Sequence, residues 1–228
     1  RTTALTAINR ELEAFSYSVS HDLRAPLLAF DGLSKALLDD YGERLDSRAR
    51  EYLQRMSGAS QRMGAVFDGL QSLFRLTSGE IHREQVDISA LAAEIAEETR
   101  ELNPDRQVTV TIAPELSASA DARLMRILLG NLISNAWKYT STKQNAAVEV
   151  GREVVDGEVR HFVRDNGVGF DMLYSHKLFG AFQRLHSQSE FPGAGIGLAT
   201  VRRIVNRHGG RCWAEGAVGE GATFYFVV

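Results

Sequence analysis

The chain has 228 residues, of which 44% are hydrophobic and 24% charged, and its formal net charge is −3. This composition supports one large or two ordinary packed domains, and it excludes the strongly basic surface that is typical of nucleic-acid or anionic-lipid binding. The single cysteine, Cys212, excludes an internal disulfide and favours a reducing compartment, so we expect a cytoplasmic location, alone or within a larger protein. No apolar run is long enough to cross a bilayer, and no signal peptide is visible. Because the chain begins at Arg1 without Met, we expect a fragment whose N-terminal part is missing.

Two helical seams occupy the first third of the chain. Apolar side chains recur in steps of three and four, which is the spacing of a heptad repeat. The first seam is Leu5, Ile8, Leu12, Phe15, Val19 and Leu23, and the second is Ala49, Leu53, Met56, Ser60, Met63, Phe67, Leu70 and Phe74. The polar segment "DDYGERL" separates them, which predicts an antiparallel hairpin of two helices, roughly 4–40 and 46–77. One hairpin has little core of its own, so we expect it to dimerise into a four-helix bundle.

The pattern changes after residue 77, where strands and helices begin to alternate. Alternating or β-branched segments predict strands near residues 81–86, 106–113, 146–155, 158–165, 211–218 and 222–228, and helical periods predict helices near 88–102, 122–140 and 196–208. This order predicts a mixed sheet with helices on one face, so the fold class is α+β, with domains at 1–77 and 78–228. The long segment 170–194 is a lid candidate.

The stretch "FSYSVSHDLRAPL" (15–27) sets His21 beside Asp22. His21 follows the seam residue Val19 by about 200° around an ideal helix, so we expect it to face water rather than the partner helices. An exposed histidine is nucleophilic when neutral, but most surface histidines have no reaction to perform. From this segment alone, His21 is either a reactive histidine or an ordinary surface histidine.

A polar stripe lies on the segment "GNLISNAWKYT" (130–140). Asn131, Asn135 and Lys138 are spaced at i, i+4 and i+7, opposite an apolar face. Amide oxygens and an ammonium group on one stripe favour binding of phosphates and a hard cation. A plain polar outer face explains the same pattern, so this motif is ambiguous alone.

Two glycine-rich segments complete the motifs. In "RDNGVGF" (164–170), Asp165 ends a predicted strand, and Gly167 and Gly169 permit close backbone approach to a ligand, although such a segment is also a common turn. The second segment, "PGAGIGLATVRRIV" (192–205), places three glycines before an amphipathic helix, where backbone N–H groups bind phosphate. It differs from the dinucleotide fingerprint and from a Walker A loop, and the signature of protein kinases is absent. A simple helix-start turn remains the structural alternative.

The order of these motifs closely resembles the transmitter region of two-component sensor histidine kinases, over about residues 5–228. That region comprises a HisKA-type dimerisation and phosphotransfer domain followed by an ATPase domain of the GHKL (Bergerat) type, an α/β sandwich. The stretch "KLFGAFQRLH…GIGLATVRRIVNRHGGRCWAEG…GATFYF" resembles the subgroup found in phytochrome-like kinases. The resemblance implies autophosphorylation by ATP with Mg²⁺, transfer to a response regulator, a homodimer, and an N-terminal sensor that this chain lacks.

The resemblance also implies roles for individual residues. His21 would accept the phosphoryl group, and Asp22 would orient the imidazole and take its proton. Asn135 would be the Mg²⁺ ligand, and Asp165, assisted by Thr223, would recognise the adenine amino group. The remaining implied ATP contacts are Asn131, Lys138, Tyr139, Gly167, Gly169, Arg184, Gly193, Gly195, Gly197 and Leu198, with Phe179 and Phe182 as apolar anchors of the lid.

One position departs from the family pattern. Four residues after the histidine, the family often has threonine or asparagine, which is tied to dephosphorylation of the regulator, whereas this chain has Ala25. Two other functions fit part of the sequence. A different GHKL ATPase would not need the histidine-bearing hairpin, and a dimeric pseudokinase scaffold would not need the intact ATP-site motifs.

Overall fold

The chain folds into two compact units, Arg1–Ser78 and Gly79–Val228. A computed structural model describes residues 23, 25–75, 80–187, 190–191 and 193–228. His21 and Asp22 lie outside the described residues. The functional assignment of the domains 1–77 and 78–228 therefore stays a prediction.

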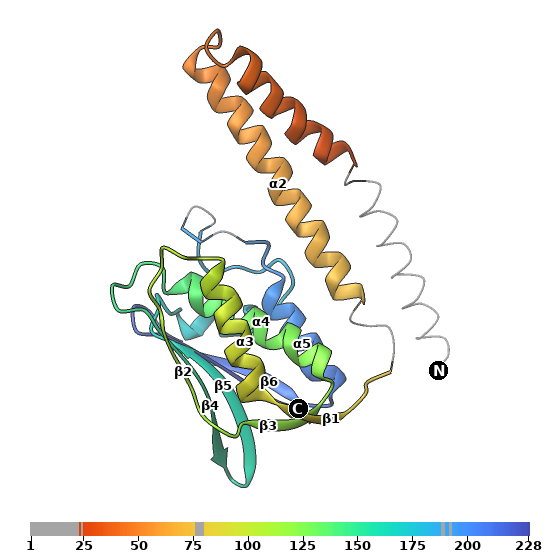
Figure 1. The fold of residues 1–228 in the computed structure, drawn as a ribbon, viewed down its shortest axis with the longest axis vertical. Helices are drawn as coiled ribbons and strands as arrows, with labels where there is room; N and C mark the ends of the chain where they lie inside the picture. The colour runs from red at the N-terminus through yellow and green to blue at the C-terminus, as the bar shows by residue number, and fades with distance from the viewer. Residues whose placement is uncertain (1–22, 24, 76–79, 188–189, 192) are drawn as a thin grey trace. The chain divides into compact units, whose positions relative to one another are not determined.

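The first unit contains a helical hairpin, in which residues 25–41 form one helix and α2 (Ser47–Arg75) the other (Figure 1). Gly42 is required at the turn, because a Cβ there would overlap the carbonyl oxygen of Leu38. Asp46 then caps α2, since its Oδ1 accepts a hydrogen bond from the N–H of Ala49 at 2.7 Å. Across the hairpin, the hydroxyl of Ser57 donates to Asp31 Oδ1 at 2.5 Å, which fixes the register of the two helices.

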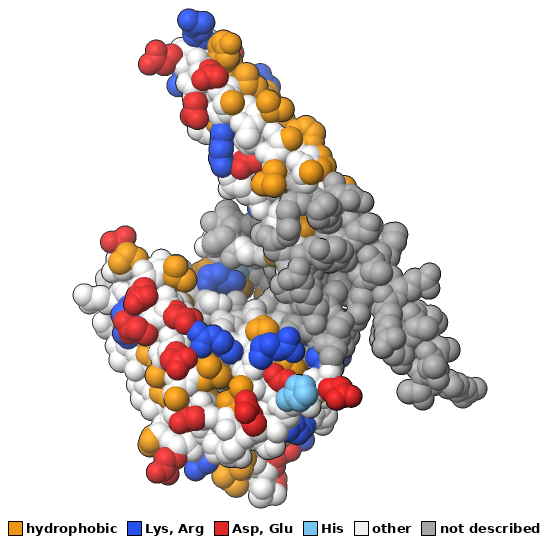
Figure 2. Space-filling view, turned by 45° about the vertical axis from the view of Figure 1, so that its right-hand side comes forward, with side chains coloured by type: hydrophobic (Ala, Val, Ile, Leu, Met, Phe, Trp, Pro, Cys, Tyr) orange, Lys and Arg blue, Asp and Glu red, His pale blue; other side chains and the backbone are white. Residues whose placement is uncertain are grey.

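The hairpin leaves an apolar stripe exposed. Figure 2 shows hydrophobic side chains gathered along one of its flanks. The exposed large apolar residues of the described part of this unit are Leu23, Leu28, Phe30, Leu33, Leu37, Tyr41, Tyr52, Met56 and Met63. Two members of the predicted second seam, Met56 and Met63, are about half exposed in the single chain, at 48% and 49%. An exposed stripe of this length is what dimerisation into a four-helix bundle would bury.

The second unit is a two-layer α/β sandwich, and the predicted α+β fold class is confirmed. Its strands are β1 (Glu84–Asp87), β2 (Thr109–Ile112), β3 (Ser117–Ala120), β4 (Ala147–Val155), β5 (Glu158–Asp165), β6 (Arg211–Ala217) and β7 (Gly221–Val227). Its helices are α3 (Ile88–Glu101), α4 (Ala122–Tyr139), the 3₁₀ helix η1 (Met172–Lys177) and α5 (Gly197–Arg207). The main sheet has the order β2-β4-β5-β7-β6, in which β2 and β4 are parallel and the other neighbours antiparallel. The helices α3, α4 and α5 lie together on one side of this sheet (Figure 1).

The core lies between the helices and the main sheet. The amphipathic period of α4 puts its apolar side chains inward, and its buried residues are Leu124, Met125, Leu128, Leu129, Leu132, Ile133, Ala136 and Trp137. Burial of several such side chains, each worth about 1.5–3 kcal/mol, fixes the rotation of α4 about its axis. The polar stripe of the same helix must then face the other way.

A polar cluster holds the far ends of α4 and α5 together. The ring of His208, at the end of α5, accepts a hydrogen bond at Nε2 from the N–H of Asp121 and contacts the carbonyl of Ile204 through Nδ1. Asp121 also caps α4, because its carboxylate accepts from the N–H of Leu124 at 3.0 Å. Arg83 donates to the carbonyl oxygen of His208. The two helices that carry the predicted ATP contacts are therefore joined at their buried ends.

The short strand β3 was not predicted from the sequence, because "SASA" has neither β-branched nor aromatic side chains. It pairs antiparallel with β1 in a separate two-stranded sheet. The predicted strand at 81–86 begins later, at Glu84. Among the described residues, no helix combines the length and the apolar composition needed to cross a membrane.

Candidate nucleotide-binding site

The polar stripe of α4 lines a cavity. Asn131, Asn135 and Lys138 are half-buried, and they form one wall of a hollow. The opposite wall is the glycine-rich segment that leads into α5. A Cβ at Gly197 would lie 2.7 Å from Asn131 Oδ1, and one at Gly193 would lie 3.5 Å from Lys138 Nζ. The glycines therefore let the backbone approach the stripe closely enough for both walls to contact one ligand.

This cavity carries positive charge. Burial, followed by the nearby charge of Arg184, lowers the pKa of Lys138 to about 8. Its ammonium lies 4.3 Å from the ring centroid of Tyr139, over the aromatic face. Lys138 and Arg184 repel each other in this half-buried space, and an anion between them would relieve the repulsion. A polyphosphate is such an anion.

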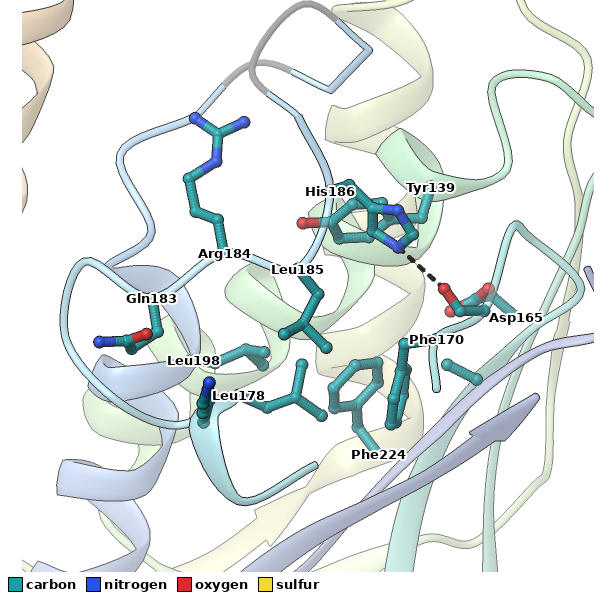
Figure 3. Close-up of a pocket in the computed structure, with 13 residues that line it drawn as sticks. Tyr139, Asp165, Phe170, Leu178, Gln183, Arg184, Leu185, His186, Leu198 and Phe224 are labelled. Carbon is teal, nitrogen blue, oxygen red and sulfur yellow. Dashed lines mark hydrogen bonds between the residues drawn. The ribbon is translucent and has the colours of Figure 1, made fainter. Parts of the chain in front are cut away.

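The carboxyl group of Asp165 lines a second cavity (Figure 3). Asp165 is the last residue of β5 and is 5% exposed. Burial raises the pKa of its carboxyl to about 6, although Oδ1 accepts a hydrogen bond from the N–H of Gly167 at 2.8 Å. The other side chains around it are largely apolar, among them Phe170, Leu185 and Phe224. A buried acceptor among apolar walls fits a flat ring that carries an amino group.

The glycines beside Asp165 have separate steric causes. Gly167 lies under Tyr139 and Asp165, and a Cβ there would be 2.7 Å from Asp165 Oδ1. Gly169 has a φ of +61°, and a Cβ there would overlap the carbonyl oxygen of Ala217. Glycine is therefore needed at Gly167 by packing against Tyr139 and the Asp165 carboxylate, and at Gly169 by its positive φ and the neighbouring backbone of Ala217.

The two cavities adjoin each other. Tyr139, Leu178, Gln183, Arg184 and Leu198 line both of them. The combined hollow has a carboxylate and apolar walls at one end, and amides, an ammonium and backbone glycines at the other. This polarity matches a nucleotide, with its base at the Asp165 end and its phosphates at the α4 stripe.

The structure does not bring Thr223 to Asp165. In the register of β5 and β7, Asp165 pairs with Ala222, whereas Thr223 pairs with Arg164 on the opposite face of the sheet. The hydroxyl of Thr223 accepts a hydrogen bond from Arg164 Nε at 3.2 Å. Ala222, and not Thr223, lines the Asp165 cavity. Because side chains alternate between the two faces of a strand, Thr223 cannot assist Asp165 as expected.

The guanidinium of Arg184 contacts the lid itself. It donates to the carbonyl oxygens of Gly193, at 2.5 Å, and Phe191. Of the two expected apolar anchors, Phe179 is half-buried, but Phe182 is 49% exposed. The positions of the lid residues Leu178, Gln183, Leu185 and His186 around the cavities were not predicted. They come from a segment without periodicity, so no sequence signal indicated their orientation.

Asn135 fits the predicted role of a magnesium ligand. Its side chain lines the phosphate-side cavity and offers a neutral amide oxygen. Within the described ranges, no group of three or more His, Cys, Asp or Glu side chains is placed to hold a metal ion. A Mg²⁺ ion in this cavity would be held by few protein ligands and by phosphate oxygens and water, which is its usual preference beside nucleotides.

Sequence models of two protein families match the chain. The His Kinase A (phospho-acceptor) domain matches residues 11–79, and the histidine kinase-, DNA gyrase B-, and HSP90-like ATPase matches residues 120–228. The chain belongs to the sensor histidine kinases. Both matches occur in the order expected of a transmitter region, with the phosphoacceptor part first.

Two curated relatives support this membership. Cyanobacterial phytochrome B of Nostoc sp. strain PCC 7120 is 34% identical over 225 residues, which cover 96% of this transmitter and 30% of the relative. The methanogenesis regulatory histidine kinase FilI of Methanothrix harundinacea is 32% identical over 223 residues, covering 97% of this transmitter and 25% of the relative. The chain thus spans about a third or less of the curated relatives it matches.

A solved structure has a similar fold. Full-length ShkA in complex with AMPPNP is 26% identical, with a TM-score of 0.65, over 93% of this transmitter and 45% of that chain.

Proposed function

We propose that this transmitter catalyses ATP-dependent phosphorylation of its own His21 and then passes the phosphoryl group to an aspartate of a separate response regulator. The observation that carries the proposal is the pair of adjoining cavities, with buried Asp165 at one end and the stripe of Asn131, Asn135 and Lys138 at the other. In this assignment, residues 1–77 dimerise and carry the phosphoacceptor, and residues 78–228 bind ATP.

The described side chains position the nucleotide. The Asp165 carboxylate accepts a hydrogen bond from the adenine amino group, and the apolar walls contact the ring faces. Lys138, Asn131 and the backbone at Gly193, Gly195 and Gly197 bind the phosphates. Asn135 would hold Mg²⁺, which would supply charge neutralisation on the phosphate oxygens. Phosphoryl transfer depends mainly on such positioning and charge compensation.

His21 performs the nucleophilic step. The lone pair of its neutral imidazole attacks the γ-phosphorus, the bond from that phosphorus to the bridging oxygen breaks, and ADP leaves. The imidazole N–H proton passes to Asp22, which also fixes the tautomer of the ring. In the second step the phosphoryl group moves from nitrogen to a carboxylate oxygen of the regulator, and the imidazole is regenerated.

The partners follow from the same proposal. A second copy of the chain covers the exposed stripe of the hairpin, which includes Leu33, Met56 and Met63. The response regulator contacts the hairpin around His21. The cytoplasmic location expected from the lone cysteine remains a prediction.

Incubation with γ-³²P-labelled ATP and Mg²⁺ tests the proposal. We expect acid-labile, base-stable label on the chain, followed by transfer of the label to one receiver domain in a profile of the regulators of the source genome. ATP hydrolysis without protein label would instead indicate another class of GHKL ATPase. Absence of nucleotide binding in calorimetry would indicate a scaffold and refute the proposal.

A further inference from the structure

His186 connects the lid to the loop that carries Asp165. Its Nε2 lies 2.8 Å from the carbonyl oxygen of Gly169, a residue 17 positions earlier in the chain. A carbonyl oxygen only accepts hydrogen bonds, so Nε2 carries the proton in this contact. Figure 3 shows the ring of His186 beside Tyr139 at the edge of the cavity, with the bond from its nitrogen drawn.

The acceptor of this bond is held rigidly. Gly169 adopts a φ of +61° in close contact with the backbone of Ala217. The preceding residue, Val168, accepts a bond from the N–H of Gly219 at 2.7 Å and donates its own N–H to the carbonyl of Tyr139 at 3.1 Å. A contact to this loop therefore fixes His186 relative to the Asp165 carboxylate.

The imidazole also belongs to a three-ring cluster. Its centroid lies 5.5 Å from the ring of Tyr139 and 5.4 Å from that of Phe191, and the last two rings are 5.0 Å apart. Tyr139 ends the helix that carries the phosphate-side stripe, and Phe191 is a lid residue that is 4% exposed. Edge-to-face and tilted aromatic pairs of this spacing are stabilising beyond the area that they bury.

Both limbs of the lid are joined at this cluster. Arg184, two residues before His186, donates to the carbonyl oxygens of Phe191 and Gly193 on the returning limb. Gly193 lies next to Lys138 Nζ in the phosphate-side cavity. When His186 is held in place, the contacts of Arg184 with Phe191 and Gly193 also hold the glycine-rich backbone of the phosphate side in place.

We propose that His186 is a positioning residue of the nucleotide site, which fixes the lid to the base pocket through Gly169 and Tyr139 and so preorganises the phosphate-binding backbone. This inference rests on the proposed function of the same site. These contacts are made within the chain itself, and their loss weakens nucleotide binding, because the lid must then be ordered at each binding event. The transfer step in the loaded enzyme keeps its rate.

Three substitutions separate the ring from the donor. His186→Phe keeps an aromatic ring and loses the donor, whereas His186→Gln keeps a donor of similar reach and loses the ring. A net hydrogen bond and an aromatic contact are each worth about fivefold in binding, so each variant raises KM for ATP about fivefold. His186→Ala loses both and raises KM about 25-fold. His176→Phe, which changes an exposed histidine of η1 outside both cavities, is the matched control.

The assay is the initial rate of autophosphorylation against ATP concentration, with equilibrium titration of AMP-PNP on the same proteins. We expect KM and the AMP-PNP dissociation constant to rise together, with kcat within about twofold of the parent. An alanine variant whose KM stays within about twofold of the parent overturns the inference. So does a fall in kcat at unchanged KM, which is the signature of partial unfolding. If the parent binds AMP-PNP but incorporates no label, the proposed kinase function fails, while the binding series still tests His186.

Discussion

Replacement of Asp165 by asparagine should make the protein more stable and unable to bind ATP. Asp165 is 5% exposed, and the pKa of its carboxyl group is raised from 3.8 to about 6, chiefly by burial. At pH 7 the folded protein must keep a charge that the interior disfavours. The two pKa values correspond to a cost of about 3 kcal/mol at most. The asparagine side chain has no such charge and keeps an oxygen for the N–H of Gly167, but its amide N–H₂ group needs a new partner, so we expect a gain of about 2 kcal/mol.

The gain should depend on pH in one direction. Between about pH 4 and pH 6 the folded carboxyl is protonated while the unfolded one is ionised, so the folded state binds more protons and loses stability as the pH rises. The advantage of Asp165→Asn is therefore absent below about pH 4, grows up to about pH 6 and stays constant above it. Both tryptophans, Trp137 and Trp213, lie in the second unit, so their fluorescence reports its unfolding. For a domain of this size, about 2 kcal/mol corresponds to a rise in Tm of about 4–8 °C.

The same substitution should abolish nucleotide binding. The carboxylate oxygen that accepts a hydrogen bond from the adenine amino group is replaced by an amide N–H₂ group, so two donors face each other. Glu220→Gln, in the exposed turn between β6 and β7, removes a carboxylate of similar charge and serves as the control. A stability difference that does not vary with pH, or one that is largest at about pH 4, would refute the argument from burial. Retained ATP affinity would refute the role of Asp165.

Three further substitutions test other parts of the account. Asn135→Ala should lose Mg²⁺-dependent ATP binding, measured by calorimetry, and autophosphorylation, measured by label incorporation. The control Ser134→Ala, on the exposed side of α4, should retain both. Near-normal label in Asn135→Ala would exclude the metal-ligand role. Phe67→Glu should convert the dimer into monomers in sedimentation, since it puts a charge into the predicted seam, and a parent chain that sediments as a monomer at micromolar concentration would contradict the bundle. Ala25→Thr should accelerate dephosphorylation of the regulator by about tenfold or more with little change in autophosphorylation, because alanine cannot hold the attacking water. Strong phosphatase activity in the parent, kept in a His21→Ala background, would show that another residue performs this task.

Regular periodicity made part of the site predictable. The stripe of Asn131, Asn135 and Lys138 follows from the 3.6-residue period of α4, whose apolar face is fixed by the core. Asp165 was predicted at a strand end because the hairpin of β4 and β5 has a clear alternation and a "DGE" turn. In these places the local pattern and the tertiary packing require the same orientation.

Register and irregular backbone were not predictable in the same way. Thr223 lies on the wrong face of β7 because the pairing of Asp165 with Ala222 is set by long-range strand contacts. The lid residue His186 lies in a segment whose sequence has no repeating pattern. Its orientation toward the cavity is fixed by contacts with the rings of Tyr139 and Phe191. Such contacts join segments far apart in the sequence, and no window of a few residues contains the information.

The location of the phosphoryl group tests most directly whether His21 is the phosphoacceptor. The parent chain and His21→Gln would be incubated with γ-³²P-labelled ATP and Mg²⁺, and binding of AMP-PNP would be measured on both proteins. We expect acid-labile label on the parent, no label on His21→Gln and equal AMP-PNP affinity for the two. Substantial label on His21→Gln would contradict the assignment of His21 as the phosphoacceptor.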